Sequence, residues 1–312
     1  MKPDIGVVVP AFRAAGTIAR TLHSALREIP SENITVVLDG PDAALEAAAR
    51  TASAGIRVVT LPHRRGAPAC RNLGFSLLNT RYVMYLDADD YVEGGFLAGA
   101  CATADAQDAD VVLGRCAVET PNGSRSLTDP GMIFAPLDHE TIMRRWLTNH
   151  YVAPCAVVWR SAFVRNLGGW DETLAKNQDG DIMHRAMMIG ARPATSSTGM
   201  GVYVQDDNPN RITVTHNRRT LESQIAVLEK IRLNLDSLAF DPSPELAQAY
   251  YALARLAYTQ GVDDLGEQAE RTARELGLKG QTGSLSHVAL SSVLGLKGKQ
   301  KLASFVRSTL RH

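Results

Sequence analysis

Three acidic residues at the end of an apolar run are the side chains of this sequence best suited to metal chemistry. Asp87, Asp89 and Asp90 follow the run Tyr82–Leu86, so their carboxylates stand where a buried strand is expected to end. Carboxylate oxygens suit Mg²⁺ or Mn²⁺, which take their remaining ligands from water and substrate phosphates. Such a metal neutralises the charge that develops when a diphosphate leaves. Taken alone, an Asp-x-Asp after a strand is more often a solvated turn, so the surrounding sequence has to decide.

A parallel sheet would place this acidic segment at one edge. Over about the first 90 residues, short β-branched runs alternate with helical patterns, which is typical of parallel strands joined by helices. We expect strands at 5–9, 34–38, 56–61 and 82–86, and helices at about 18–29, 43–52 and 67–78. Ligands bind beyond the carboxyl ends of such strands, so chemistry is expected in the segments that follow them.

The rest of the chain predicts two kinds of structure. Between Glu93 and Tyr203 we expect helices near 96–104 and 181–190 and strands near 111–113 and 156–159. Beyond Asn217 strand patterns vanish and amphipathic helices dominate, with Leu221, Ile225, Leu228 and Ile231 at helical spacing. We therefore predict an α/β domain over residues 1–217 and a helical extension over residues 218–312.

Composition narrows the class of protein. Lys and Arg number 33 and Asp and Glu number 33, so no overall field favours nucleic acid as a partner. We find neither a signal-peptide pattern at the start nor an apolar run of membrane-spanning length. The four cysteines lack Cys-x-x-Cys spacing, which argues against structural zinc and favours reduced thiols. We expect a cytoplasmic protein.

Several motifs occur in one order along the chain. They are Val7–Phe12, Val36–Gly40, Gly66–Gly74, Leu86–Asp90, Gly168–Glu172 and Gln178–Asp181. This series resembles the family 2 glycosyltransferases over about the first 215 residues. The resemblance implies the GT-A fold, an α/β fold in which a nucleotide-binding mixed sheet is flanked by helices, here with a C-terminal helical extension.

The resemblance assigns the donor's base to the ends of the first two strands. Pro10, Ala11 and Phe12 correspond to the segment that packs beside the base, and Asp39 to the acid that recognises it, usually as uracil. The usual acidic pair is Leu38-Asp39 here, which alters the residue that often reads the base. The alternative for Asp39 is a structural role at the start of a turn.

The resemblance assigns the phosphate side of the donor to three further residues. Arg71 opens the helix before the acidic segment, where a planar, permanently charged guanidinium suits a base carbonyl or a phosphate oxygen. Asp87 would contact the ribose or the metal, and Asp89 would be the main ligand of Mn²⁺ or Mg²⁺. The alternative for Arg71 is a surface salt bridge.

A transferase also needs a base, because a sugar hydroxyl is a poor nucleophile until a positioned group takes its proton. Asp179 is the candidate, since Gly169–Glu172 and Gln178–Asp181 resemble the acceptor-side acidic motif of the family. The usual glutamate before the base is Gln178 here. A helix cap is the alternative role for Asp179, and Asp181 is the alternative base.

The resemblance extends loosely to other positions. Arg211 and His216 are candidates for a phosphate and a metal contact, with a solvated loop as the alternative. His150 and Trp170 fall on the acceptor side, and a buried structural role is the alternative for each. Beyond Glu275 no acidic residue follows, and segments 288–296 and 302–310 are amphipathic. This basic tail predicts either helices packed on the main domain or peripheral contact with an anionic membrane.

Together these features predict an inverting, metal-dependent glycosyltransferase. It would move a sugar from a nucleoside diphosphate sugar, expected to be a UDP-sugar, to a saccharide, lipid-linked or protein acceptor. Synthesis of a surface polysaccharide or glycoconjugate is the expected context. Two alternatives stay open: a catalytically silent nucleotide-sugar-binding or scaffold protein of this fold, and a sugar-nucleotide pyrophosphorylase. The latter needs a Gly-rich basic loop, which Pro10–Gly16 does not supply.

Overall fold

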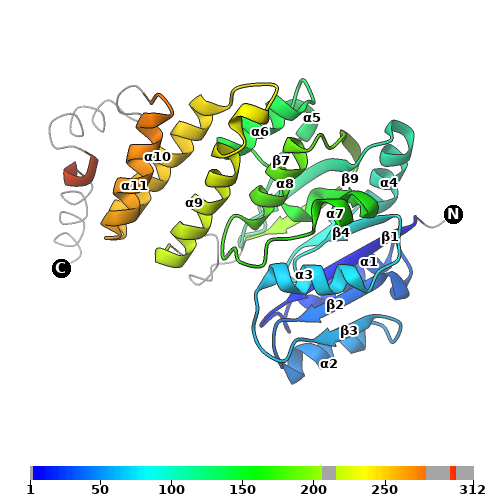
Figure 1. Cartoon of the computed structure of the whole chain (residues 1–312). Helices are drawn as coiled ribbons and strands as arrows, with labels where there is room; N and C mark the ends of the chain where they lie inside the picture. Colours follow the sequence, from blue (N-terminus) through cyan, green and yellow to red (C-terminus); the bar gives the residue numbers. More distant parts are fainter. Residues whose placement is uncertain (1–2, 206–215, 279–295, 300–312) are drawn as a thin grey trace. The chain divides into compact units, whose positions relative to one another are not determined.

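The computed structural model describes residues 3–205, 216–278 and 296–299 (Figure 1). The chain divides into two compact units. The first comprises residues 1–145, 150–172 and 178–208, and the second comprises residues 146–149, 173–177 and 209–312. The predicted domain boundary after residue 217 stays a prediction.

A mixed sheet forms the first unit. Its strand order is β3-β2-β1-β4-β8-β6-β9-β5, and β7 pairs with β6. The strands are β1 (Ile5–Ala11), β2 (Ile34–Leu38), β3 (Arg57–Thr60), β4 (Tyr82–Tyr85), β5 (Tyr91–Glu93), β6 (Val111–Glu119), β7 (Arg125–Thr128), β8 (Val157–Arg160) and β9 (Pro193–Val204). Strands β3, β2, β1 and β4 are mutually parallel, whereas β8 runs antiparallel to both β4 and β6. The sheet is therefore parallel at one end and mixed beyond β4.

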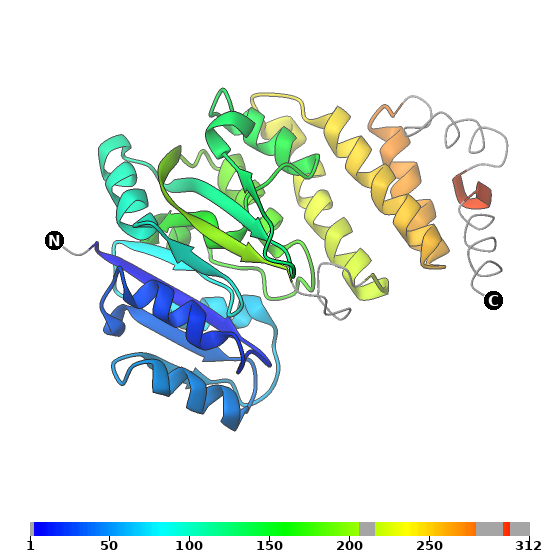
Figure 2. The same ribbon diagram turned by 180° about the vertical axis from the view of Figure 1, so that it is seen from behind.

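Helices cover both faces of this sheet. They are α1 (Ile18–Leu26), α2 (Ala43–Ala52), α3 (Ala67–Ser76), α4 (Phe96–Gln107), α5 (Pro130–Ile133), α6 (His139–Leu147), α7 (Ser161–Leu167) and α8 (Gln178–Met188). Figures 1 and 2 show α3 and α7 on one face and α1 and α4 on the other. The four strands and three helices predicted up to residue 86 are confirmed, with ends that differ by a few residues.

Local sequence explains why the parallel end forms. Strands β1, β2 and β4 are buried along their whole lengths, as continuous apolar runs require in a sheet covered on both faces. Helix α3 lies so close to the sheet that a Cβ atom on Gly74 would stand 2.4 Å from Cγ1 of Val8. The glycine therefore sets the depth at which Arg71, one turn earlier on α3, enters the protein.

The second unit is helical where it is described. It contains α9 (Arg218–Arg232), α10 (Ser243–Thr259) and α11 (Asp263–Glu275), together with a short helical turn at 296–299. Asn217 begins α9 with a capping box, its side chain accepting a hydrogen bond from the backbone N–H of Thr220. The hydroxyl of Tyr250 donates to Glu229 over 2.6 Å, which joins α10 to α9. The predicted helical character of the C-terminal region is confirmed for these residues.

The membrane prediction concerns the last part of the chain. Within the described ranges, no helix combines the length and the apolar character needed to cross a bilayer. The amphipathic segments predicted at 288–296 and 302–310 lie outside the described residues, apart from Leu296. A cytoplasmic location and peripheral membrane contact both stay predictions.

Candidate active site

The acidic segment forms a turn beyond the carboxyl end of β4. The backbone N–H of Asp90 donates to the carbonyl of Asp87 over 3.1 Å, closing the turn. Asp87 keeps 32% of its side-chain surface and Asp89 is exposed, whereas Asp90 is completely buried. Oδ1 of Asp90 accepts a hydrogen bond from the backbone N–H of Val204, at the end of β9. Asp90 therefore ties the turn to the sheet, while Asp87 and Asp89 keep part of their surface exposed.

A buried arginine lies between the acidic turn and the start of α8. Nη2 of Arg71 donates to Oδ1 of Asp87 over 2.8 Å and Nη1 donates to Oε1 of Gln178 over 3.2 Å. The same Nη1 lies 3.6 Å from Oδ1 of Asp179. Burial acts to lower the pKa of Arg71, but Asp87 and Asp179 outweigh it and raise that pKa, so the guanidinium stays charged. Three residues predicted from separate motifs thus meet at one point.

The surroundings of Asp179 favour its binding a proton. Burial raises its pKa to about 6, with Asp87 acting in the same direction and Arg71 against it. Its Oδ1 is enclosed and has no hydrogen-bond partner among the described residues, while the side chain as a whole keeps 44% exposure. A carboxylate that is ionised at neutral pH, but has an elevated pKa, suits general base catalysis.

Two aromatic rings support Arg71. Its guanidinium carbon lies 4.2 Å from the ring centre of Trp170, and the ring of Trp170 meets that of Tyr85 edge to face at 5.0 Å. Burial raises the pKa of the Tyr85 hydroxyl, and its interaction with the side chain of Trp170 acts in the opposite direction. Nε of Arg71 is buried without a hydrogen-bond partner among the described residues, which is costly for a charged donor. Trp170 is buried and also belongs to this cluster around Arg71. Tyr85 was not predicted from the sequence, because it looks like an ordinary strand residue.

Polar contacts hold the loop that carries Trp170. The Oδ1 of Asn72 accepts from the backbone N–H of Trp170 over 2.9 Å, and Nδ2 donates to the carbonyl of the same residue. Arg185 donates to the carbonyls of Leu167 and Gly169 and to Oδ2 of Asp181. Asp181 is 1% exposed and pairs with Arg185 at 2.8 Å, so its carboxylate helps to hold this loop. The acid next to Arg71 that reaches the surface is Asp179.

Asp39 lies where β2 ends, but its carboxylate turns toward the loop before α3. Its Oδ1 accepts from the backbone N–H groups of Arg65 at 2.6 Å and Gly66 at 3.0 Å. Gly66 precedes α3 with a φ of 94°, a conformation that suits glycine. Asp39 thus caps the approach to α3, and the prediction that it recognises the base remains a prediction.

Pro10 and Ala11 are buried at the end of β1, whereas Phe12 is 41% exposed. The guanidinium carbon of Arg64 lies 4.1 Å from the ring centre of Phe12, and its Nε lies 3.7 Å from Oδ2 of Asp39. The guanidinium carbon of Arg13 lies 5.0 Å from the same ring centre, so the ends of β1 and β2 form a surface with one aromatic ring, one carboxylate and two arginines. Nothing in the pattern of the sequence points to Arg64, because its loop carries no motif.

The acidic turn suits a divalent cation that brings its own further ligands. Among the described residues, no group of three or more His, Cys, Asp or Glu side chains is arranged to hold a metal ion. Asp87 and Asp89 supply the hard oxygen ligands that Mg²⁺ and Mn²⁺ prefer, and these ions commonly use one or two carboxylates plus substrate phosphates. The two side chains fit this mode of binding, which needs the donor's diphosphate to complete the coordination.

Three further positions were predicted as contacts of the donor, metal or acceptor. His150 is exposed. His216 belongs to the second unit, where its Nδ1 lies 3.3 Å from Nζ of Lys176. Arg211 lies outside the described residues. The roles suggested for these three residues stay predictions.

Residues 6–166, just over half of the chain, match the model of glycosyl transferase family 2. The chain belongs to this family, as the order of its motifs predicts. A pre-mycofactocin glycosyltransferase of Mycobacterium tuberculosis is 31% identical over 199 residues, an alignment that covers 61% of this chain and 40% of the relative. The succinoglycan biosynthesis protein ExoU of Rhizobium meliloti is 28% identical over 257 residues, covering 76% of this chain and 72% of the relative.

Solved structures share the fold. A fragment of S. aureus TarS in complex with UDP-GlcNAc has a TM-score of 0.61 at 16% identity, covering 87% of this chain and 92% of that one. The mannosyltransferase PcManGT of Pyrobaculum calidifontis, in complex with GDP-Man and Mn²⁺, has a TM-score of 0.56 at 16% identity, covering 99% and 85%. The predicted GT-A-type α/β fold is thereby confirmed.

Proposed function

We propose that this protein transfers a sugar from a nucleoside diphosphate sugar to an acceptor hydroxyl, with inversion at the anomeric carbon. The observation that carries the proposal is the position of Arg71. One buried guanidinium bonds to Asp87 at 2.8 Å and lies 3.6 Å from Asp179. The carboxylate proposed for the donor and the carboxylate proposed for the acceptor are thus neighbours of one cation.

Each residue has a distinct task in this proposal. Asp87 and Asp89 hold a divalent cation, which when bound withdraws charge from the departing diphosphate. Arg71 lies where a phosphate or ribose oxygen can share its guanidinium with Asp87. Its fixed position costs no reorganisation as charge develops on the leaving group.

Asp179 serves as the general base. Its exposed oxygen takes the proton of the acceptor hydroxyl as that oxygen bonds to the anomeric carbon, while the bond from that carbon to the diphosphate breaks. A pKa of about 6 keeps most of the carboxylate ionised at neutral pH and still makes it a better base than an ordinary aspartate. A single displacement inverts the configuration and needs no nucleophile from the protein.

The relatives support the class of donor and the biological context. TarS was solved with UDP-GlcNAc and PcManGT with GDP-Man and Mn²⁺, so nucleoside diphosphate sugars and a divalent metal occur on this fold. ExoU and ExoO are named for succinoglycan biosynthesis. We assign this chain to the synthesis of a surface polysaccharide or glycoconjugate, with a UDP-sugar as the first donor to test.

One observation favours a second candidate, a silent nucleotide-sugar-binding protein. Gln178 replaces the usual glutamate, and the carboxylate of Asp39 is engaged by the loop before α3. The two candidates differ in turnover. Donors would be screened by thermal shift with Mn²⁺, since a bound ligand stabilises the fold in proportion to its affinity.

The donor found in this screen would then be offered with a panel of acceptors while release of the nucleoside diphosphate is followed. Transfer with an inverted anomeric centre, assigned by NMR, supports the enzyme. Donor binding without hydrolysis or transfer across the panel would favour the silent protein.

A further inference from the structure

One helix holds the whole segment that follows the proposed metal ligands. Nη2 of Arg20 on α1 donates to the carbonyl of Asp89 over 2.8 Å, and Oγ1 of Thr21 donates to the carbonyl of Asp90 over 2.7 Å. Farther along the same face, Oγ of Ser24 accepts from the backbone N–H of Val92 over 3.2 Å. Just past α1, Glu28 accepts from the backbone N–H groups that begin α4. The path of the backbone from residue 89 to residue 97 thus follows polar side chains of one helical segment.

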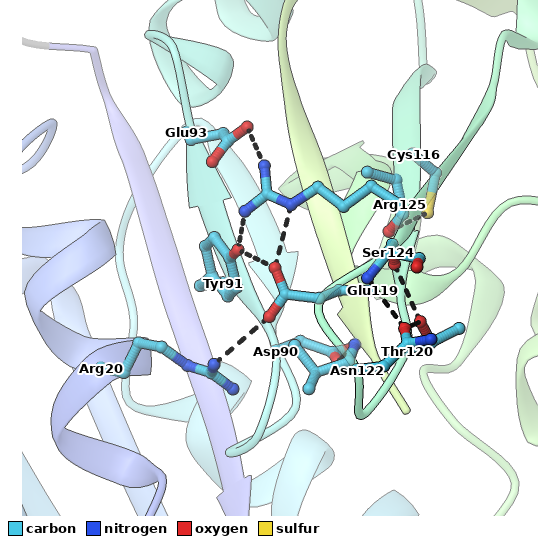
Figure 3. Close-up of polar contacts among 12 residues, drawn as sticks. Arg20, Asp90, Tyr91, Glu93, Cys116, Glu119, Thr120, Asn122, Ser124 and Arg125 are labelled. Carbon is cyan, nitrogen blue, oxygen red and sulfur yellow. Dashed lines mark hydrogen bonds and ion pairs between the residues drawn. The ribbon is translucent and has the colours of Figure 1, made fainter. Parts of the chain in front are cut away.

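Arg20 is itself held by charged and aromatic neighbours, shown in Figure 3. We call Arg20, Tyr91, Glu93, Glu119 and Arg125 the Arg20 network. Nη1 of Arg20 lies 3.7 Å from Oε1 of Glu119, and its guanidinium carbon lies 4.9 Å from the ring centre of Tyr91. The hydroxyl of Tyr91 donates to Oε2 of Glu119 over 2.8 Å. One guanidinium nitrogen of Arg20 therefore bonds to the acidic turn, and the other is directed at Glu119 in this network.

Arg125 completes the network from β7. Its Nε donates to Oε2 of Glu119 over 2.9 Å and its Nη1 donates to Oε1 of Glu93 over 3.0 Å. Glu119 and Arg125 are directly opposite each other in the antiparallel pair of β6 and β7. The tight turn between these strands is closed by hydrogen bonds among Thr120, Asn122 and Ser124, which are also drawn in Figure 3. The network holds two arginines and two glutamates, so its charges balance.

We propose that Arg20 is a positioning residue for Asp89, acting through the carbonyl of Asp89 and supported by the Arg20 network. This inference rests on the proposed function, because it assumes that Asp89 binds the donor's metal. Asp89 is exposed on a turn, where its backbone has more freedom than a strand would allow. The bond from Arg20 limits rotation of the peptide that follows Asp89 and so holds the backbone from which its carboxylate extends.

The network has the properties of a positioning device more than those of a stabilising one. The side chains of Arg20 and Arg125 keep 44% and 41% exposure, and half-exposed ion pairs contribute little to stability. Partners that orient metal ligands, by contrast, commonly change metal affinity or activity by about 10–100-fold when removed. Loss of Arg20 should therefore separate metal-dependent binding from folding.

The test compares binding of UDP in Mn²⁺ and in EDTA by calorimetry, with GDP as the second nucleotide. We expect Arg20→Met to weaken binding in Mn²⁺ by about tenfold and to leave binding in EDTA unchanged. Arg20→Lys should recover part of the loss, since one ammonium can reach the carbonyl of Asp89 without also serving Glu119. The control is Arg50→Met, which removes an exposed arginine paired with Glu46 on α2.

Thermal unfolding checks the fold of each variant, and Tyr91→Phe gives a second route that keeps Arg20. Tyr91→Phe should weaken binding in Mn²⁺ by about twofold to threefold. Wild-type affinity in Mn²⁺ for Arg20→Met, or an equal loss in Mn²⁺ and EDTA, would overturn the positioning role. If the wild-type protein binds nucleotide equally in Mn²⁺ and EDTA, the proposed metal site fails instead, and the Arg20 inference fails with it.

Discussion

Two arginines contact the acidic turn from opposite sides, and they do so differently. Arg71 is buried, bonds to a side-chain carboxylate of the turn and keeps an Nε atom without a partner among the described residues. Arg20 is half exposed, bonds to a backbone carbonyl of the turn and joins a charge-balanced network. An arginine that pairs with carboxylates and has hydrogen-bond donors to spare can also bind a ligand. An arginine committed to the backbone sets geometry.

This difference predicts how variants on the two sides should fail. Changes around Arg71 should alter the chemical step and its pH dependence, because its charge interacts with both Asp87 and Asp179. Changes around Arg20 should alter metal-dependent affinity with little effect on the chemistry. The distinction between the two arginines is wrong if both sets of variants change the chemical step and the metal-dependent affinity in the same way.

The largest effect is expected for Asp179→Asn. Asparagine keeps the size and polarity of Asp179, the second residue of α8, but it cannot take a proton. The rate of transfer at saturating donor should fall by about 10²–10⁴-fold, the usual contribution of a general base, with donor affinity kept. Asp42→Asn at the start of α2 is the matched control, since Asp42 caps that helix through the N–H of Leu45. Equal rates for Asp179→Asn and wild type would leave Asp179 as a cap.

The pH profile sharpens the same side of the comparison. Because Asp179 must be ionised to act, kcat/KM should fall as pH drops below about 6, by about tenfold for each unit of pH. Arg71 lowers the pKa of Asp179, and lysine would place its charge less well. Arg71→Lys should therefore move this acidic limb of the pH profile to higher pH. Arg20→Met should leave the limb in place. A limb that moves equally in both variants would contradict the division of roles.

The smallest of these effects concerns stability. The pKa of Asp179 is about 6 in the folded protein, whereas an unfolded aspartate titrates near ~3.9. The folded state therefore keeps a proton that the unfolded state loses, and this contribution to stability disappears as pH rises through about 6. Asp179→Asn should be more stable than wild type at pH 7.5, by less than about 1 kcal/mol because the carboxyl is half exposed.

Thermal unfolding measures this difference. The melting temperature of Asp179→Asn should exceed that of the wild type by about 1–3 °C at pH 7.5, and the difference should vanish near pH 4. A difference that stays constant between the two pH values would show that Asp179 has an ordinary pKa.

The sequence predicts the parallel end of the fold and the acids of the site for identifiable reasons. Continuous apolar runs mark β1, β2 and β4, and the ends of β2 and β4 fix where Asp39 and Asp87 must lie. Strand β9 was missed because Thr195–Gly199 is rich in small and polar residues and lacks alternation. Strand β5 has three residues, too few for a periodic pattern.

Contacts between distant segments explain what else escaped. Arg20 and Asp89 are separated by 69 positions, and Arg71 and Asp179 belong to different motifs. Their meeting depends on the order in which strands assemble, which local patterns do not encode. The same holds for Asp90, whose carboxylate accepts a hydrogen bond from the backbone of Val204, 114 positions farther along the chain.

The most direct test of the account is the rate of nucleoside diphosphate release by the wild type and by Asp89→Ala, each assayed in Mn²⁺ with the donor found by thermal shift. Asp89 is exposed on its turn, so the substitution should leave the fold intact. The account predicts that Asp89→Ala loses at least about 100-fold in rate, since a ligand that orients the metal on the diphosphate is removed. Undiminished release by a folded Asp89→Ala protein would contradict it.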